Sequence, residues 1–429
     1  MKTVIMAGGA GTRISGLFPD IPKPLIPIAG VPVLERELLE LKEQGFDDVI
    51  LTVSHMADAI TAHFGDGSRL GIRLSYFVEK TPLGNAGALF ELKDSLTDDF
   101  LLLNADTVYN VDFNRFVAFH RAKGGLATLF THPNSHPYDS GLIVADNNHA
   151  VERWYTGEEE RPRYYKNRVN AGLHVLSKAL IGKRPDTPRV DLDRQLLKPL
   201  AGTGKMFCYD SPEYVKDMGT PERFEAVCRD YASGQIEEKN LRHKQKAIFI
   251  DRDGTINRYG GFVRSTDAFV LEENAAEAIR MVNASGYLAV VITNQPVIAR
   301  GEVTEEGLTE IHNKMETLLG EAGAYLDAIY YCPHHPDKGF AGEIPSLKIV
   351  CECRKPKPGM LHMAENDLNI DLSASWMIGD EMNDILAGKA AGTRTGWIRR
   401  EKKEPEHTPD LTGDDLLDVV TKILEGDKN

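Results

Sequence analysis

The feature that most constrains this fold is an alternation of short, β-branched apolar runs with helical patterns, which the chain starts twice. The first series of strand-like runs lies at residues 3–7, 49–53, 72–78 and 100–104. The second series lies at residues 247–250, 288–293, 326–331 and 376–378. Such alternation is typical of a parallel sheet covered by helices on both faces. The sequence therefore predicts two α/β domains, which agrees with a length of 429 residues.

The stretch between the two series shows where one domain ends. Strand-like runs with few helices between them predict a mixed sheet that closes one side of a cleft, at residues 126–131, 141–145, 171–176 and 206–210. A helix is expected at 222–231, and the polar, highly charged residues that follow have no apolar period. We expect a domain at 1–234, a linker at 235–245 and a second domain at 246–429. Residues 333–346 show neither the helical nor the strand periodicity of apolar residues, so a long loop is expected there.

The charge balance restricts the function. The chain has 50 Lys and Arg against 64 Asp and Glu, a net charge of −14. Such an acidic chain has no overall attraction for nucleic acid or anionic membranes, so local groups must hold any phosphate. No apolar run approaches the roughly 20 residues that span a bilayer, and the first residues lack a signal peptide. We expect a cytoplasmic enzyme of small-molecule substrates, without nucleic acid or membrane partners, and the oligomeric state stays open.

A glycine-rich turn follows the first strand. Gly8-Gly9-Ala10-Gly11-Thr12-Arg13 comes directly after it, and Lys23 lies between two prolines ten residues later. Glycines let backbone N–H groups approach a polyphosphate, while Arg13 can clamp phosphate oxygens and the prolines stiffen the loop that carries Lys23. A tight turn between strand and helix would explain the glycines alone equally well.

The whole pattern resembles the sugar-phosphate nucleotidyltransferases, which join a nucleoside triphosphate to a sugar 1-phosphate and release pyrophosphate. The matching blocks are GGAGTR, PKP, PLGNAG at 82–87, NAD at 104–106, NAG at 170–172 and DMGTP at 217–221. The resemblance covers about 1–232 and implies a Rossmann-like fold with a mixed sheet. It implies catalytic roles for Arg13 and Lys23, and Mg²⁺ at Asp106 and Asp217. The substrate contacts that it implies are Gly8, Gly9, Gly11, Thr12, Gly84, Asn85, Asn170 and Gly172.

One departure concerns the sugar end of this domain. Where the family has a Glu-Lys pair after the strand ending near Trp154, this chain has Tyr155-Thr156-Gly157-Glu158. Lys166 is a candidate replacement, although an ordinary surface lysine is the favoured interpretation. The lysine that meets the sugar phosphate therefore stays unassigned.

A second group of polar residues follows the strands of the C-terminal series. Asp251 and Asp253 come directly after 247–250, Thr293 ends the next strand, Lys355 precedes a helix, and Asp380 ends another strand. The carboxyl ends of parallel strands meet at one edge of the sheet, where such folds bind ligands. A DxD pair alone is often only a solvated loop, but we expect this set to converge.

This set resembles the haloacid dehalogenase superfamily of phosphatases. The resemblance implies that Asp251 is the nucleophile and that Asp253 is the general acid and base. Mg²⁺ would be held by Asp251, Asp253 through its backbone carbonyl, and Asp380. The groups implied to hold the phosphoryl oxygens are Thr293, Asn294 and Lys355.

Clustered cysteines indicate a metal in the long loop. Cys332, His334, Cys351 and Cys353 have the ligand types of a tetrahedral Zn²⁺ site. With DRDGTIN, TNQ and CRKPKPGM, this loop resembles the D-glycero-D-manno-heptose 1,7-bisphosphate phosphatases over about 245–400, with histidinol-phosphate phosphatases as close relatives. Pro296-Val297 and Glu381 depart from that pattern. Candidate substrate contacts are Asn257, Arg300 and Arg354.

The two resemblances describe consecutive reactions. Removing the 7-phosphate of a heptose 1,7-bisphosphate leaves the 1-phosphate that a nucleotidyltransferase consumes. We predict a bifunctional enzyme that makes GDP-D-glycero-α-D-manno-heptose from GTP. The guanine rests on resemblance alone, since heptose adenylyltransferases have a different fold. One alternative is a mannose or other hexose 1-phosphate nucleotidyltransferase fused to a phosphatase of other specificity, such as histidinol phosphate. Another is a regulatory module that binds nucleotide sugars, although it would not require both Asp106 and Asp217.

Overall fold

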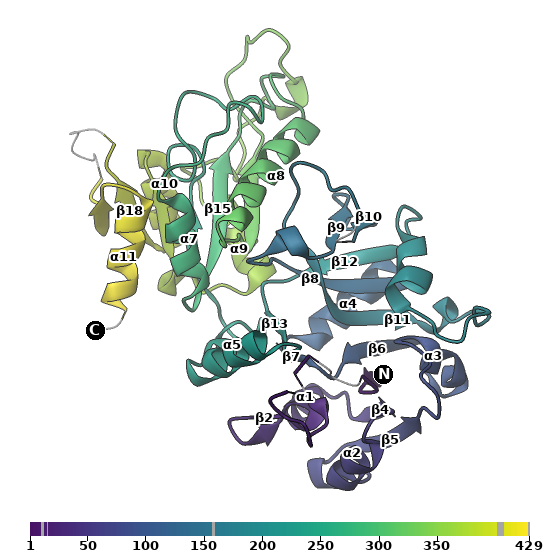
Figure 1. Cartoon of the computed structure of the whole chain (residues 1–429). Coiled ribbons are helices and arrows are strands. Elements are labelled where there is room, and N and C mark those ends of the chain that lie inside the picture. The colour runs from purple at the N-terminus through teal and green to yellow at the C-terminus, as the bar shows by residue number, and fades with distance from the viewer. Residues whose placement is uncertain (10–12, 15, 157–158, 401–406, 428–429) are drawn as a thin grey trace. The chain divides into compact units, whose positions relative to one another are not determined.

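The computed structural model describes residues 1–9, 13–14, 16–156, 159–400 and 407–427. The predicted contacts Gly11 and Thr12 lie outside the described residues. The chain divides into two compact units (Figure 1). Unit 1 comprises 1–132, 141–156 and 168–240, and unit 2 comprises 133–140, 157–167 and 241–429. The change at 240 to 241 falls inside the expected linker, which begins with the short helix α6 (Gln235–Glu238). The predicted domain ranges themselves stay a prediction.

Unit 1 is built on a mixed sheet with the order β10-β9-β11-β6-β1-β4-β5, to which β8 and β12 are added through β11. Its strands are β1 (Lys2–Met6), β4 (Asp48–Val53), β5 (Arg73–Val78), β6 (Asp99–Asn104), β8 (Ala127–His132), β9 (Leu142–Ala145), β10 (Val151–Tyr155), β11 (Val169–Ser177) and β12 (Met206–Asp210). The first four are parallel, and β11 runs antiparallel to β6. The predicted mixed sheet is confirmed.

The sheet of unit 1 is buried on both faces. Neighbouring residues of β1 point in opposite directions, so Ile5 packs into one apolar cluster and Val4 into the other. The helices are α1 (Val33–Glu43), α2 (Ala57–Phe64), α3 (Gly87–Glu91), α4 (Phe113–Lys123) and α5 (Pro221–Ala232). Two small antiparallel pairs complete the unit, namely β2 (Pro27–Ile28) with β3 (Val31–Pro32) and β7 (Thr107–Asn110) with β13 (Tyr214–Asp217).

Unit 2 has a parallel sheet with the order β16-β15-β14-β17-β18-β19. Its strands are β14 (Lys246–Ile250), β15 (Tyr287–Asn294), β16 (Ala328–Cys332), β17 (Trp376–Gly379), β18 (Arg394–Ile398) and β19 (Leu411–Gly413). Strand β14 lies in the middle because later strands add on both of its sides, which makes its carboxyl end the ligand-binding edge of a doubly wound fold. The sequence analysis found β14 to β17 and missed β18 and β19.

The helices of unit 2 cover both faces of this sheet (Figure 1). One apolar cluster holds α7 (Ala275–Asn283), α8 (Glu305–Glu321) and α11 (Leu416–Gly426). The other holds α9 (Gly359–Leu368) and α10 (Met382–Ala391). Residues 333–344 contain no helix or strand, as expected for the long loop. Among the described residues, no helix has the length and apolar character needed to cross a bilayer.

Unit 2 also contains two segments from the first half of the sequence, 133–140 and 157–167. Their backbone is held by helix α8. The N–H of Tyr165 donates to Thr317 Oγ1 over 3.0 Å, and the N–H of Asn167 donates to Glu316 Oε2 over 2.9 Å. Both acceptors are buried. Helix α8 is therefore fixed by polar bonds as well as by its apolar face.

Candidate active sites and metal centre

A cavity of about 770 Å³ opens at the carboxyl ends of the parallel strands of unit 1. Of the predicted residues, seven line it: Gly8, Gly9, Arg13, Lys23, Gly84, Asn85 and Asp106. Lining residues that the sequence analysis did not single out include Ser54, Glu79, Asn104 and Arg189. A cavity of this size can take a nucleotide or a sugar phosphate, since small-molecule sites commonly measure about 300–1,000 Å³.

The charged groups of this site meet around Gly219. A methyl group added there would lie 3.0 Å from Asp217 Oδ1, 3.2 Å from Arg13 Nη2 and 3.6 Å from Lys23 Nζ. Lys23 Nζ also contacts Asp106 Oδ2 at 2.5 Å. Asp217 pairs with Arg223, whose Nη1 lies 2.6 Å from Oδ2. Arg13, Lys23 and Asp217 therefore gather around Gly219, and Asp106 pairs with Lys23. Their roles in catalysis and metal binding stay predictions.

The remaining predicted residues of unit 1 have different roles in the geometry. Gly84 has φ +81°, and a Cβ there would overlap the Val190 carbonyl, so only glycine fits this lining position. Asn85 Oδ1 accepts the N–H of Leu192 over 2.7 Å, so this side chain fixes a neighbouring loop. Asn170 Oδ1 accepts the N–H of Gly172 over 3.2 Å.

Lys166 does not join this constellation. It is exposed, belongs to unit 2 and is absent from the residues that line the cavity. Gly172, in contrast, lies beside the cavity-lining Asn104, because a Cβ on Gly172 would lie 2.5 Å from Asn104 Nδ2. The lysine that meets the sugar phosphate therefore stays unassigned.

Three carboxylates converge at the carboxyl edge of the unit 2 sheet. Asp251, Asp380 and Asp384 each offer an oxygen, and these atoms lie within 4.8 Å of one another. Lys355 Nζ joins them, at 2.6 Å from Asp251 Oδ1 and 2.5 Å from Asp384 Oδ1. The same ammonium donates to the carbonyl of Ile292 over 2.8 Å. The carboxylate cluster has the oxygen ligands that a hard divalent cation prefers.

Burial and mutual repulsion set the protonation of this cluster. Burial, followed by the neighbouring Asp384, raises the pKa of Asp380 to about 7. Burial also raises the pKa of Asp251 well above its ordinary value, against the opposing charge of Lys355. Burial alone would lower the pKa of Lys355, but Asp251 and Asp384 hold it above its ordinary value. Lys355 and Arg400 bring two positive charges to three carboxylates, so a proton or a cation must supply further positive charge.

The carboxylate of Asp253 is bound differently. It accepts hydrogen bonds from Arg252 and, over 2.8 Å, from Gln295 Nε2. Its side chain is not part of the three-carboxylate cluster. The predicted nucleophile and the predicted acid and base therefore have different cationic partners, Lys355 and Arg252.

The other predicted contacts of unit 2 divide into two groups. Thr293 lies one residue before the end of β15 and its Oγ1 accepts from Gln295, while Asn294 holds the backbone of Lys355 through two hydrogen bonds. Asn257 is fully buried, and its amide donates to the carbonyl of Arg258.

Two predicted basic contacts belong to the loop region. Arg300 stacks on Phe340, with 4.1 Å from Cζ to the ring centroid. Arg354 donates to the carbonyl of His334 over 3.3 Å.

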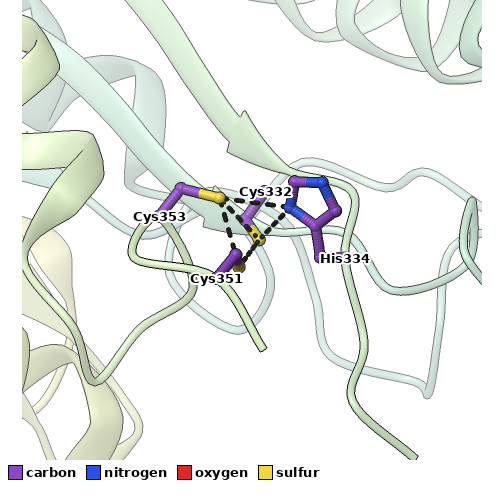
Figure 2. Close-up of side chains that lie close together, drawn as sticks. All are labelled: Cys332, His334, Cys351 and Cys353. Atoms are coloured by element: carbon purple, nitrogen blue, oxygen red, sulfur yellow. Dashed lines mark hydrogen bonds between the residues drawn. The ribbon is translucent and has the colours of Figure 1, made fainter. Parts of the chain in front are cut away.

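The cysteine cluster forms a compact group of side chains that could hold a metal ion (Figure 2). The sulfur of Cys353 lies 3.2 Å from that of Cys332, 3.3 Å from that of Cys351 and 3.3 Å from Nδ1 of His334. A tetrahedron with metal–sulfur bonds of about 2.3 Å has edges of about 3.8 Å. The four ligands are therefore gathered at nearly the separation that a tetrahedral ion requires. Burial raises the pKa of the Cys332 thiol, so binding of a metal would release its proton.

Two residues that the sequence analysis missed contact the carboxylate cluster. Asp384 lies four residues after Asp380, at the start of α10, where its carboxylate accepts the N–H of Glu381 over 3.1 Å. Arg400 follows β18, and its Nε lies 3.5 Å from Asp380 Oδ2. Asp384 was a detectable signal, because an acidic residue in the first turn of the helix that follows Asp380 stays close to the end of the strand. Nothing in the sequence marked Arg400.

Comparisons with known proteins found relatives of both halves of the chain. A family model described as nucleotidyl transferase matches residues 2–234, and one described as HAD-hydrolase-like matches residues 352–423. The D-glycero-β-D-manno-heptose-1,7-bisphosphate 7-phosphatase of Salmonella typhi is 41% identical over 186 residues. That match covers 42% of this chain and 97% of the relative.

Two solved structures are also similar. HddC from Yersinia pseudotuberculosis is 25% identical, with a TM-score of 0.47, and the match covers 54% of this chain and 99% of that one. D,D-heptose 1,7-bisphosphate phosphatase from B. bronchiseptica, complexed with magnesium and phosphate, is 31% identical with a TM-score of 0.37. This second match covers 42% of this chain and 99% of that one.

The space around Gly219 predicts the effect of adding one methyl group. Gly219→Ala places that group against Asp217 and Arg13. We expect nucleotidyl transfer, followed as pyrophosphate release, to fall at least about tenfold, because displaced catalytic groups lose their alignment. Gly182→Ala is the matched control, since an added Cβ there meets nothing within 4 Å. Equal activity of the two variants would contradict this arrangement of the site.

The raised pKa of Asp380 predicts a pH-dependent affinity for Mg²⁺. In the cation-free protein the proton on this carboxyl favours folding at low pH, and that contribution is lost as pH rises from 3.8 to about 7. A cation must displace the proton below pH 7, so the apparent affinity should fall about tenfold per pH unit there. Thermal unfolding of the full chain during Mg²⁺ titration at pH 6 and pH 8 measures this dependence.

The exposed Asp414 gives the control for that titration. Asp414→Asn should keep the pH dependence, whereas Asp380→Asn should remove the part of the stabilisation by Mg²⁺ that differs between pH 6 and pH 8. An affinity that is equal at pH 6 and pH 8 in the folded protein would contradict the assignment.

Proposed function

We propose that this chain is a bifunctional enzyme of nucleotide-activated heptose synthesis. It belongs to the nucleotidyl transferase family through residues 2–234. Through its C-terminal half it belongs to the family of the D-glycero-β-D-manno-heptose-1,7-bisphosphate 7-phosphatases. The observation that carries the proposal is the presence, on one chain, of two phosphate sites whose reactions can follow each other. The phosphatase site of unit 2 would release a sugar that keeps its 1-phosphate. A sugar 1-phosphate is the kind of substrate that the transferase site of unit 1 would consume.

The phosphatase reaction begins at Asp251. A carboxylate oxygen attacks the phosphorus of the 7-phosphate, the bond from phosphorus to the sugar oxygen breaks, and Asp253 gives its proton to that oxygen. Asp253 then accepts a proton from water as the water attacks the aspartyl-phosphate, which frees inorganic phosphate and restores Asp251. Lys355 holds the nucleophile and neutralises part of the charge that approaches it. Mg²⁺ held by Asp251, Asp380 and Asp384 would neutralise the remaining charge between nucleophile and phosphate.

The transferase reaction needs mainly alignment and positive charge. An oxygen of the heptose 1-phosphate attacks the α-phosphorus of the triphosphate, and the bond to the leaving pyrophosphate breaks. Arg13 and Lys23 stand where they can neutralise the phosphates, and Asp106 and Asp217 would hold Mg²⁺. We propose GTP as the donor, on the resemblance of the N-terminal blocks to guanylyltransferases of this type.

The cysteine centre has a structural role in this proposal. Zn²⁺ bound by Cys332, His334, Cys351 and Cys353 would tie the irregular loop after β16 to the residues before Lys355. That loop has few apolar contacts of its own to hold it, so a tetrahedral ion is a sufficient anchor.

A base panel tests the two activities together. The full chain is incubated with Mg²⁺, one nucleoside triphosphate at a time, and the α or the β anomer of D-glycero-D-manno-heptose 1,7-bisphosphate. We expect phosphate release with every triphosphate and pyrophosphate release with GTP alone. The anomer is a variable because the relatives named above act on the β form. If none of the nucleoside triphosphates gives pyrophosphate, the transferase activity is contradicted.

Asp251→Asn separates the two sites in the same assay. It removes the nucleophile, so phosphate release from the bisphosphate should be lost, while supplied heptose 1-phosphate should still yield pyrophosphate. Loss of both activities in the folded variant would contradict two independent sites.

Metal analysis tests the zinc centre. We expect one tightly bound zinc per full chain, and Cys353→Ser should reduce it to near zero because one ligand of the tetrahedron is weakened. Cys228→Ser is the control, since Cys228 lies outside the cluster and should keep the metal. Purified wild-type protein without zinc would contradict the assignment.

A further inference from the structure

Arg252 lies between the two aspartates of the DRD sequence, and its side chain is fully buried. A buried guanidinium is costly unless its donors are satisfied, because it cannot lose its charge. Its Nη2 donates to both oxygens of Asp253 over 2.8 Å, and its Nε donates to Oδ1 over 3.2 Å. The arginine therefore faces the proposed acid and base, and not the proposed nucleophile.

The other side of the guanidinium is occupied by a histidine. Arg252 Nη1 lies 3.2 Å from Nε2 of His312, on helix α8. Because arginine can only donate, Nε2 must accept, so His312 is neutral and carries its proton on Nδ1. Burial lowers the pKa of His312 well below its ordinary value, and the charge of Arg252 lowers it further. In this pair Arg252 is always the donor and neutral His312 is always the acceptor.

A third group completes the hold on Asp253. Gln295 Nε2 donates to Oδ2 over 2.8 Å and to Thr293 Oγ1 over 2.9 Å. The carboxylate of Asp253 is therefore bound from one side by Arg252 and from the end of β15 by Gln295. Helix α8, which provides His312, is itself fixed by the buried Glu316 and Thr317.

From this geometry we propose that Arg252, held by His312, is a positioning residue that aims the carboxylate of Asp253 at the leaving oxygen and later at the attacking water. The inference rests on the proposed phosphatase activity. Arg252 touches neither substrate nor reacting atoms, because its side chain is enclosed. It acts through Asp253, so its loss should slow only the steps in which Asp253 moves a proton.

Two substrates separate those steps. Nitrophenolate leaves p-nitrophenyl phosphate as a stable anion without a proton, so formation of the aspartyl-phosphate from this substrate does not need Asp253 as an acid. Its hydrolysis still needs Asp253 as a base. With heptose 1,7-bisphosphate, both steps need the proton transfer, because an alkoxide is a poor leaving group.

The test uses Arg252→Lys in the full chain, with rapid-mixing and steady-state kinetics. For p-nitrophenyl phosphate, we expect the burst rate constant to stay within about threefold of wild type while steady-state turnover falls about tenfold to a hundredfold. For the bisphosphate, kcat should fall by the same factor with KM nearly unchanged. Asp253→Asn gives the upper limit of this pattern, and Arg264→Lys, at a surface ion pair with Glu302, gives the control.

The histidine supplies a second pair of variants. His312→Gln keeps an acceptor for Arg252 and should retain most turnover, whereas His312→Leu removes it and should reproduce the selective loss. A uniform loss in burst and turnover, or wild-type turnover in both Arg252→Lys and His312→Leu, would overturn the proposal. If wild type hydrolyses p-nitrophenyl phosphate but not the bisphosphate, the proposed substrate fails while the positioning role is still tested.

Discussion

The ammonium of Lys355 is the interaction on which the phosphatase half of the molecule depends. It bonds to the proposed nucleophile Asp251, to Asp384 and to the carbonyl of Ile292, with almost no exposure to water. Removing one partner of a buried ion pair costs about 3–5 kcal/mol, because the other charge is left without compensation. Three elements far apart in the sequence, β14, β15 and α10, are thereby joined at the point where a phosphate must enter.

The two halves both gather carboxylates and cations at one site, but they do so at different depths. In unit 1, the side chains of Asp106 and Asp217 are each 42% exposed, beside cations that can turn to arriving phosphates. In unit 2, Asp251 and Asp384 are 10% and 1% exposed. Partial exposure suits a site that must admit two polyanions, whereas burial suits a carboxylate that has to shed water before it attacks phosphorus.

From the sequence, side chains of these sites could be placed where they come immediately after a strand, while their roles stay predictions. Asp251, Thr293 and Asp380 could be placed because parallel strands end at one edge, and Arg13 and Lys23 because proline and glycine restrict their loops. The pattern could not show which side chains are already used by the fold. Asn85 bonds the backbone of Leu192, and Asn294 bonds that of Lys355. Arg400 follows a strand that was itself missed, so no local signal pointed to it.

A metal ion at the cysteine cluster would protect the thiols against oxidation as well as anchor the loop. Three sulfurs lie 3.2 to 3.6 Å apart, while a disulfide requires about 2 Å. A shift of little more than 1 Å would join any two of them once no ion holds them apart. Chelation in air would then leave a crosslinked loop that added metal cannot refill, and only a reductant would restore it.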